Sequence, residues 1–319
     1  MIQRKALLAV ACVFLTVAPL PAWNATGHMT VAYVAYKRLD KKVRGRVDQL
    51  LMLNPNYSQW TAGVAESQKG VVAFLNAATW PDCIKGATCP GYHSDGGSGG
   101  NAPPPGPEAS QNVGYTDKAM HKYWHFIDLP FSPAGLPLEQ PVTPNAETQI
   151  PVFVTTISGA ATDELKSYDV VWLEHLVGDI HQPLHATGRF TAGHPHGDAG
   201  GNGVKFCVDP CRDTLHGYWD DLLGTSADPK VIAKIGDKLL KNKKPSAAKV
   251  LTPSVWVKDS FELAKLHVYR VPIGLDDNPA NFISPRPDAA YAANAKKVAD
   301  AQVLLAGYRL AGLLNANLH

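Results

Sequence analysis

Apolar residues recur at helical spacing along most of the chain. In the segment 30–53, Val31, Val34, Ala35 and Leu39 fall on one side of a helix, with charged residues between them. The same periodicity predicts six more helical segments, several of which begin or end near proline or glycine. These segments are 64–75, 148–181, 213–223, 229–240, 253–269 and 287–317.

Three stretches between these segments lack any periodicity. Residues 83–114, 130–144 and 190–210 are irregular, and the first is rich in glycine and proline, so we expect it to be an insertion that packs little. The longest helical pattern stops before Pro183, and Gly159 is a candidate break within it. No β-type alternation and no internal repeat stands out. The pattern therefore predicts an all-α fold, a single mostly helical domain with long Gly/Pro-rich loops.

The first residues have the composition of an export signal. Arg4 and Lys5 precede an apolar run at 6–18, and Pro19-Leu-Pro-Ala22 follows with a small residue at its end. The run is short for a membrane span, although a single membrane anchor is the alternative. We expect a signal peptide at 1–22, cleavage that makes Trp23 the new N-terminus, and one domain at 23–319. The mature protein would then be secreted or periplasmic and free of the membrane.

The overall composition excludes a disordered chain and a generally basic surface. Hydrophobic residues make up 45% of the 319 residues and charged residues 18%, which is typical of a globular protein. The chain has 30 basic and 28 acidic side chains, and without Arg4 and Lys5 the numbers are equal. Binding to nucleic acid would therefore need local charge or bound metal.

Four cysteines remain once Cys12 leaves with the signal peptide. An even number in an oxidising compartment predicts disulfides. Of the three connectivities, we favour the pairs closest in sequence, Cys83–Cys89 and Cys207–Cys211. A four-cysteine zinc site is the alternative, but neither spacing is the Cys-x₂-Cys that such sites usually have.

Two histidine–aspartate pairs have the same helical spacing. His175 precedes Asp179 by four residues, and His216 precedes Asp220 by four. On a helix this spacing places both side chains on one face, one turn apart. Imidazole and carboxylate together suit zinc, although a single such pair also arises often by chance as a surface pair. Both pairs here lie among apolar residues, where unpaired charges are costly.

Four further motifs carry the same residue types. They are Gly178-Asp-Ile-His-Gln-Pro-Leu-His185, Tyr123-Trp-His-Phe-Ile-Asp128, Ala78-Thr-Trp-Pro-Asp82 and Trp23-Asn-Ala-Thr-Gly-His28. Taken alone, each of these histidines could be a core residue and each aspartate a helix cap. Their joint order along the chain, from Trp23 to about Leu223, resembles the S1/P1 nuclease family. That resemblance implies a secreted, mostly helical enzyme built around a buried cluster of three zinc ions.

The resemblance also implies the metal ligands. One zinc would take Asp82, His125, His175 and Asp179, and a second would take His185, His216 and Asp220. The third would take His28, Asp179 and Trp23, the last through its freed α-amino nitrogen and its carbonyl oxygen. Asp179 would bridge two of the ions.

The chemistry that the resemblance implies is hydrolysis of nucleic acid. Metal-activated hydroxide would cleave single-stranded DNA and RNA to 5′-phosphate products, and the enzyme would also act on 3′-nucleotides. Asp82 and Asp179 would be catalytic as ligands, and Lys85 and Asp128 match a family pair near the phosphate, although a plain salt bridge is the alternative. Phe126 matches the residue on which a base stacks, although core packing would also explain it.

Asn202 matches a family asparagine that faces the base or the phosphate. We expect no stable protein partner and a monomeric enzyme.

Two other functions compete with this one. Zinc-dependent phospholipase C shares the three-metal plan, but that resemblance would imply a longer gap from Trp23 to the first histidine and a glutamate in place of Asp220. A non-catalytic zinc-binding or storage protein would favour dense histidine runs, and only His194 and His196 approach one.

Overall fold

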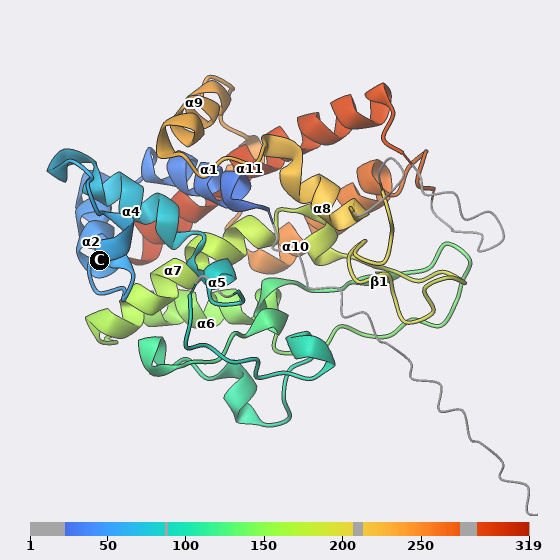
Figure 1. The fold of residues 1–319 in the computed structure, drawn as a ribbon, viewed down its shortest axis with the longest axis horizontal. Helices are drawn as coiled ribbons and strands as arrows, with labels where there is room; N and C mark the ends of the chain where they lie inside the picture. The colour runs from blue at the N-terminus through green and yellow to red at the C-terminus, as the bar shows by residue number, and fades with distance from the viewer. Residues whose placement is uncertain (1–22, 87–88, 207–212, 275–285, 319) are drawn as a thin grey trace, which may run out of the picture.

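The computed structural model describes residues 23–86, 89–206, 213–274 and 286–318. Helices dominate these residues, and Figure 1 shows them gathered into one body. In chain order the α-helices are α1 (Ala25–Tyr36), α2 (Lys41–Leu51), α3 (Tyr57–Trp60), α4 (Lys69–Ala77), α5 (Trp80–Cys83), α6 (Ala146–Ser158), α7 (Asp163–Asp179), α8 (Leu215–Asp220), α9 (Pro229–Leu239), α10 (Pro253–Leu263) and α11 (Ala289–Asn317). The all-α prediction is confirmed.

Short elements connect the helices. The 3₁₀ turns are η1 (Glu66–Gln68), η2 (Ser98–Gly100), η3 (Pro107–Ser110), η4 (Gly114–Thr116), η5 (Lys122–His125), η6 (Pro183–Ala186), η7 (Asp221–Leu223) and η8 (Ser246–Lys249), and the π-helical η9 is Ala264–Val268. The two strands of the described residues, β1 (Pro130–Phe131) and β2 (Gly188–Arg189), pair in parallel with Pro130 opposite Gly188. This small ladder links the irregular segment after η5 to the one after η6.

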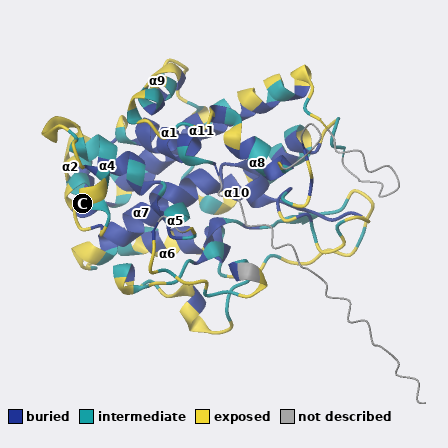
Figure 2. Ribbon diagram, viewed as in Figure 1, coloured by how far each residue is buried: buried dark blue, intermediate teal, exposed yellow. Residues whose placement is uncertain are grey.

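Helix α7 lies at the centre of the fold. Its residues from Lys166 to Asp179 are all buried, as are those of α1 from Thr26 to Ala35, so both helices are surrounded by other elements (Figure 2). Helices α1, α2, α6 and α11 all pack on α7. Helix α11 approaches α1 closely at Gly307, where a Cβ atom would lie 2.5 Å from the Val34 side chain. A helix buried on all sides can hold polar side chains only where other groups satisfy them.

Most predicted helices are present, with altered ends. The pattern at 148–181 is divided at Gly159, the C-terminal cap of α6, as the sequence indicated. The prediction of a single helix at 30–53 is wrong, because the chain turns after Tyr36 and α2 begins at Lys41. At this turn Leu39 is buried, and its carbonyl accepts a hydrogen bond from Arg44. Both helices present an apolar side to the same core, so the periodicity continues across the turn.

The Gly/Pro-rich segment 83–114 packs more than its composition suggested. Cys89 and Ala109 are buried, and the Ala109 carbonyl accepts a 2.9 Å hydrogen bond from the Trp124 indole. The prediction that this insertion packs little is therefore wrong. The predicted disulfide Cys83–Cys89 is present at its start. Cys207 and Cys211, for which a second disulfide was predicted, lie outside the described residues.

No helix in the described part of the chain is long and apolar enough to cross a bilayer.

Candidate metal centre

Six elements direct histidine and aspartate side chains to one place in the fold. They form three groups whose potential ligand atoms lie within 4.8 Å of one another. The groups are His28, His175 and Asp179; Asp82, His125 and His175; and His185, His216 and Asp220. The structure thus brings together all eight side chains that the sequence proposed as metal ligands.

The first two groups meet on α7. The Nε2 atom of His175 lies 2.9 Å from His125 Nδ1 and 3.4 Å from Asp82 Oδ1. Asp179 Oδ2 lies 3.1 Å from His125 Nδ1 and 3.2 Å from His175 Nε2, whereas its other oxygen, Oδ1, lies 3.3 Å from His28 Nε2. The two oxygens of the Asp179 carboxylate therefore face different histidines, Oδ1 facing His28 and Oδ2 facing His125 and His175.

Close packing of α1 on α7 makes this arrangement possible. The rings of His28 and His175 stack with centroids 3.9 Å apart. Beside them a Cβ atom on Gly178 would lie 2.8 Å from His28 Nδ1, so a larger residue there would displace the ring. The sequence motif Gly178-Asp179 thus supplies both a ligand and the space for its neighbour.

The third group is built from η6 and α8. His185 Nε2 lies 3.0 Å from His216 Nε2, and His216 Nε2 lies 3.5 Å from Asp220 Oδ2. The Nδ1 atom of His185 is 2.8 Å from the His125 carbonyl, and that of His216 is 2.7 Å from the Gly200 carbonyl. A carbonyl only accepts, so each Nδ1 carries the proton and each Nε2 presents a lone pair.

These donor sets fit a divalent metal ion. Two lone pairs facing each other at 3.0 Å repel unless a cation lies between them. Asp220 Oδ2 has no hydrogen-bond partner among the described residues. Two ligands about 2.0 Å from a tetrahedral zinc are about 3.3 Å apart, close to the separations found here. His175 also donates from Nδ1 to a backbone carbonyl, that of Ala78, a contact typical of metal-binding histidines.

Burial and neighbouring charges set the protonation of the ligands. Burial, together with the charge of nearby His185, lowers the pKa of His216 to about 3. Burial and then the Lys85 ammonium lower the pKa of His125, also to about 3. For His175, burial acts to lower the pKa, but the carboxylates of Asp179 and Asp82 outweigh it and raise the pKa to about 10. Most of these imidazoles are thus neutral near pH 7, the state that binds metal.

Two supporting residues were not identified from the sequence. Gln182 donates from Nε2 to Asp220 Oδ1 at 2.8 Å and accepts from the Leu184 backbone N–H at 2.6 Å, which fixes the Asp220 carboxylate. Gly200 has a φ of +61°, and a Cβ atom there would lie 2.5 Å from the Leu184 carbonyl. Only glycine suits this position, from which the backbone holds His216.

Asp198 organises the loop that contains Gly200. Its carboxylate accepts hydrogen bonds from the backbone N–H groups of Arg189 and Gly201 and from the Tyr269 hydroxyl. The Arg189 side chain pairs with it at 3.3 Å. The motif at 178–185 contained Gln182, but nothing in its local pattern indicated these long-range contacts.

Lys85 and Asp128 lie in different surroundings. Lys85 Nζ is 2.6 Å from Asp82 Oδ1 and 3.4 Å from His125 Nδ1, so its charge is next to the second group. For Asp128, burial and the nearby Asp198 carboxylate raise the pKa to about 7. The structure thus places the lysine at the metal-ligand cluster and shows it paired with Asp82.

The two residues predicted to bind substrate differ in how firmly they are held. Phe126 is half-buried, directly follows the ligand His125, and belongs to neither of the two apolar clusters of the described residues. Asn202 donates to the Ala199 carbonyl at 2.9 Å, while its Oδ1 has no partner in the described part of the chain. The core-packing explanation for Phe126 therefore gains no support.

The N-terminal residues of the domain are fixed against α8 and η7. Trp23 is fully buried beside Gly27. Asn24 caps α1, and its side-chain amide donates to Asp221 Oδ1 and to the Gly224 carbonyl, both at 2.6 Å. The main chain just before α1 is thus held at the end of α8, where the Asn24 backbone N–H donates to the Asp220 carbonyl at 3.4 Å.

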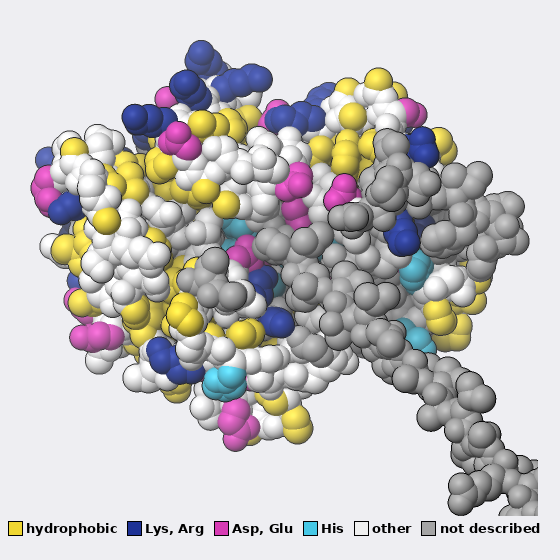
Figure 3. All heavy atoms as spheres, in the orientation of Figure 1, with side chains coloured by type: hydrophobic (Ala, Val, Ile, Leu, Met, Phe, Trp, Pro, Cys, Tyr) yellow, Lys and Arg dark blue, Asp and Glu magenta, His cyan; other side chains and the backbone are white. Residues whose placement is uncertain are grey.

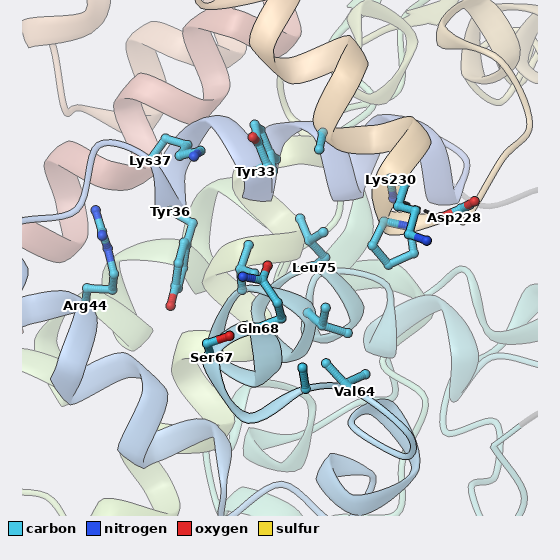
Figure 4. A pocket seen from close by; sticks show the side chains of 15 residues that line it. Tyr33, Tyr36, Lys37, Arg44, Val64, Ser67, Gln68, Leu75, Asp228 and Lys230 are labelled. Atoms are coloured by element: carbon cyan, nitrogen blue, oxygen red, sulfur yellow. Dashed lines mark hydrogen bonds between the residues drawn. The ribbon is translucent and has the colours of Figure 1, made fainter.

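A separate pocket of about 620 Å³ lies between α1, α2, α4 and the start of α9 (Figure 4). Its floor is apolar, and Lys37, Arg44 and Lys230 are among its lining residues. None of the eight potential ligands lines this pocket, so it is distinct from the metal centre.

The family model for the S1/P1 nucleases matches residues 23–319, nearly the whole chain. The chain belongs to the S1/P1 nuclease family. A search of curated proteins found no match to it. As a member of this family the chain is a hydrolytic, metal-dependent nuclease that acts on nucleic acids. The three histidine–aspartate groups of this S1/P1 nuclease are where metal ions could bind.

Proposed function

We propose that residues 23–319 form a secreted or periplasmic zinc enzyme that hydrolyses single-stranded DNA and RNA. The enzyme would be an endonuclease and a 3′-nucleotidase and would hold three zinc ions. The observation that carries the proposal is the convergence of eight buried or half-buried ligand side chains, together with family membership. The paired Nε2 lone pairs of His185 and His216 are its most specific part.

The proposed ligand sets are those that the family resemblance implies, and the contacts among the eight histidine and aspartate side chains support them. One zinc would be held by Asp82, His125, His175 and Asp179, and a second by His185, His216 and Asp220. The third would be held by His28, Asp179 and the main chain of Trp23. The family match begins at Trp23, which supports removal of residues 1–22 and a free amine at this residue.

The proposed reaction is hydrolysis at phosphorus. Bound zinc lowers the pKa of water to about 7 and stabilises charge on phosphate oxygens. The hydroxyl group of water is added to phosphorus, the bond from phosphorus to the 3′ oxygen breaks, and that oxygen leaves as a hydroxyl. The phosphate remains on the 5′ side of the next nucleotide. Asp82 and Asp179 would hold the metal ions in position. The Lys85 ammonium lies where it can pair with a phosphate oxygen.

Single strands are the expected substrate because base binding relies on stacking. A base can stack on Phe126 only if it is free of its own helix, and each stacked base contributes about 1–3 kcal/mol. Asn202 Oδ1 is buried without a hydrogen-bond partner among the described residues, and we expect this side chain to face the base or the phosphate. Asp128, with its pKa raised to about 7, can hold a proton near neutral pH and donate it to a substrate atom. We expect no stable protein partner and a monomeric enzyme.

The test uses protein that begins at Trp23. Zinc content is measured by elemental analysis, and the same preparation is assayed on single-stranded DNA, RNA, a 3′-nucleotide and phosphatidylcholine. About three zinc ions per chain and chelator-sensitive release of 5′-nucleotides would support the proposal. Cleavage of lipid alone would indicate a phospholipase, and tight zinc binding without hydrolysis would indicate a storage protein.

A further inference from the structure

Helix α9 carries a row of lysines along one side. Lys230, Lys234, Lys238 and Lys241 follow each other at four-, four- and three-residue spacing and are all exposed. Lys230, Lys234 and Lys238 lie on one continuous stripe of the α9 surface, and Lys241 follows in the turn after the helix ends at Leu239. In Figure 3, dark blue Lys and Arg side chains gather at the upper edge of the molecule, where Figure 1 shows α9.

These charges are not compensated within the protein. Among the described residues, none of the four lysines forms an ion pair. Between residues 230 and 249 the sequence has seven lysines and one acid, Asp237, in a domain with equal numbers of basic and acidic residues. The Asp237 carboxylate accepts a 2.9 Å hydrogen bond from the Tyr33 hydroxyl, so it is directed toward α1.

The lysines have no evident part in holding α9 in place. The helix is fixed by its other side, where Ile232 and Leu239 are buried. There a Cβ atom on Gly236 would lie 2.3 Å from the Tyr33 ring, so α9 and α1 are in close contact. Four uncompensated charges on the opposite side raise the electrostatic cost of folding rather than lower it.

The basic surface continues beyond α9. Lys230 lines the pocket between α1, α4 and α9, and Lys37 and Arg44 line the same pocket (Figure 4). Asp228, also at this pocket, caps α9 by accepting from the Lys230 backbone N–H at 2.8 Å. The charge around the row therefore remains positive.

The row is also fixed relative to the metal centre. Lys230 follows the ligand Asp220 by ten residues, and the intervening segment is bonded to the start of α1. Thr26 donates to the Ser226 carbonyl at 2.7 Å, and Asn24 donates to the Gly224 carbonyl. A strand with one end at the metal centre can therefore meet a rigidly placed basic surface.

We infer that this lysine row binds the phosphate backbone of a single-stranded nucleic acid outside the metal centre. From Lys230 to Lys238 the helical part of the row is about 12 Å long, so together with Lys241 it can neutralise several successive phosphates. Lysines without aromatic or amide partners give binding without base preference. The inference rests on the proposed nuclease function, and it adds that long strands bind more tightly than mononucleotides.

The test compares two triple variants with equal loss of charge. K230Q/K234Q/K238Q removes three lysines of the row, and K41Q/K42Q/K258Q removes three exposed lysines of α2 and α10. For the row variant, the KM for a 40-nucleotide single strand should rise about tenfold, while the KM for a 3′-mononucleotide stays unchanged. The slope of log(kcat/KM) against log[salt] should fall by about 2, since each lost phosphate contact removes about 0.7.

Binding to a labelled 40-mer by the chelator-treated protein separates this inference from the proposed function. If the wild-type protein shows no nuclease activity but binds the 40-mer, and the row substitutions weaken that binding, the proposed function is disproved and the inference is kept. Equal effects of the two triple variants, or no effect of the row variant on the long strand, would overturn the inference. Binding of anionic vesicles but not of the 40-mer would overturn it as well.

Discussion

The Nε2 atoms of His185 and His216 lie 3.0 Å apart, and each ring has its Nδ1 hydrogen-bonded to a main-chain carbonyl. Both Nε2 atoms are therefore acceptors, and the pair is favourable only around a cation. Because folding creates this contact, metal binding and stability are coupled.

Removing metal should lower the stability of the folded protein. A ligand present at about 1,000 times its Kd contributes about 4 kcal/mol. We expect chelation to lower the Tm by at least 5 °C, and added zinc to restore it more fully than magnesium does, because imidazole is the better ligand for zinc. Thermal unfolding followed by circular dichroism measures the shift. An unchanged Tm after verified removal of metal would argue against the coupling.

Asp179→Asn should abolish activity and reduce metal content. The two oxygens of Asp179 face His28 on one side and His125 and His175 on the other, so the loss of its charge affects two groups. We expect kcat to fall at least 1,000-fold and zinc content to fall below three per chain. Asp163→Asn, at the exposed start of the same helix, is the matched control and should leave both unchanged. Full activity with full zinc in Asp179→Asn would disprove the bridging role.

Gln182→Glu should weaken the site that contains Asp220. The substitution keeps the size of the side chain but replaces the amide that donates to Asp220 Oδ1 with a second carboxylate. Loss of such a supporting contact typically costs 10–100-fold in metal affinity or activity. Zinc titration measures the affinity, and high zinc should rescue kcat. If the loss persists at saturating zinc, Gln182 does more than position Asp220.

His121→Gln should destabilise the fold in a pH-dependent way. His121 is buried between Asp95, 3.0 Å from Nδ1, and Asp117, 2.7 Å from Nε2, and the Tyr123 hydroxyl also contacts it at 3.0 Å. Burial acts to lower the pKa of His121, but the two carboxylates raise it above its usual value. Removing the partner of buried charges lowers the free energy of unfolding by about 3 kcal/mol. The exposed His93→Gln is the control.

The stability contributed by His121 and the stability contributed by Asp95 depend on pH in opposite directions. The contribution of His121, whose pKa is raised on folding, is complete below about pH 6.5 and is lost as the pH rises through the raised pKa. For Asp95, burial raises the pKa, but His121 and then Tyr123 lower it to about 2, so that contribution is lost between about pH 4 and pH 2. The stability difference between wild type and His121→Gln should therefore be largest from about pH 4 to 6.5. A flat difference from pH 3 to 9 would contradict this.

The sequence predicted those parts of the site that depend on local geometry. His175 with Asp179 and His216 with Asp220 lie one turn apart on α7 and α8 because helical spacing alone decides it. The approach of His28 to Asp179 depends on contact between two helices 150 residues apart, and only the family resemblance indicated it.

Long-range contacts also explain what the sequence missed. The Gly/Pro-rich segment looked unpacked because composition does not show that Asp95 accepts a hydrogen bond from the Tyr123 hydroxyl. The turn between α1 and α2 was missed since both helices supply apolar residues to one core. The spacing of the four lysines is visible in the sequence, but only the structure shows that they are exposed and form no ion pair among the described residues.

A residue added before Trp23 should remove one metal ion. In the proposed third site, Trp23 contributes its α-amino nitrogen, and an added alanine converts that amine into an amide that no longer binds zinc. Trp23 is fully buried, and Asn24 is bonded to Asp221 and Gly224, so the start of the chain has little freedom to adjust. We expect zinc to fall from about three to about two per chain and kcat to fall at least 100-fold. Elemental analysis and the nuclease assay measure both, with an alanine added after His319 as the control. Because the added residue leaves His28 and Asp179 in place, unchanged zinc and activity would show that the amine is not a ligand.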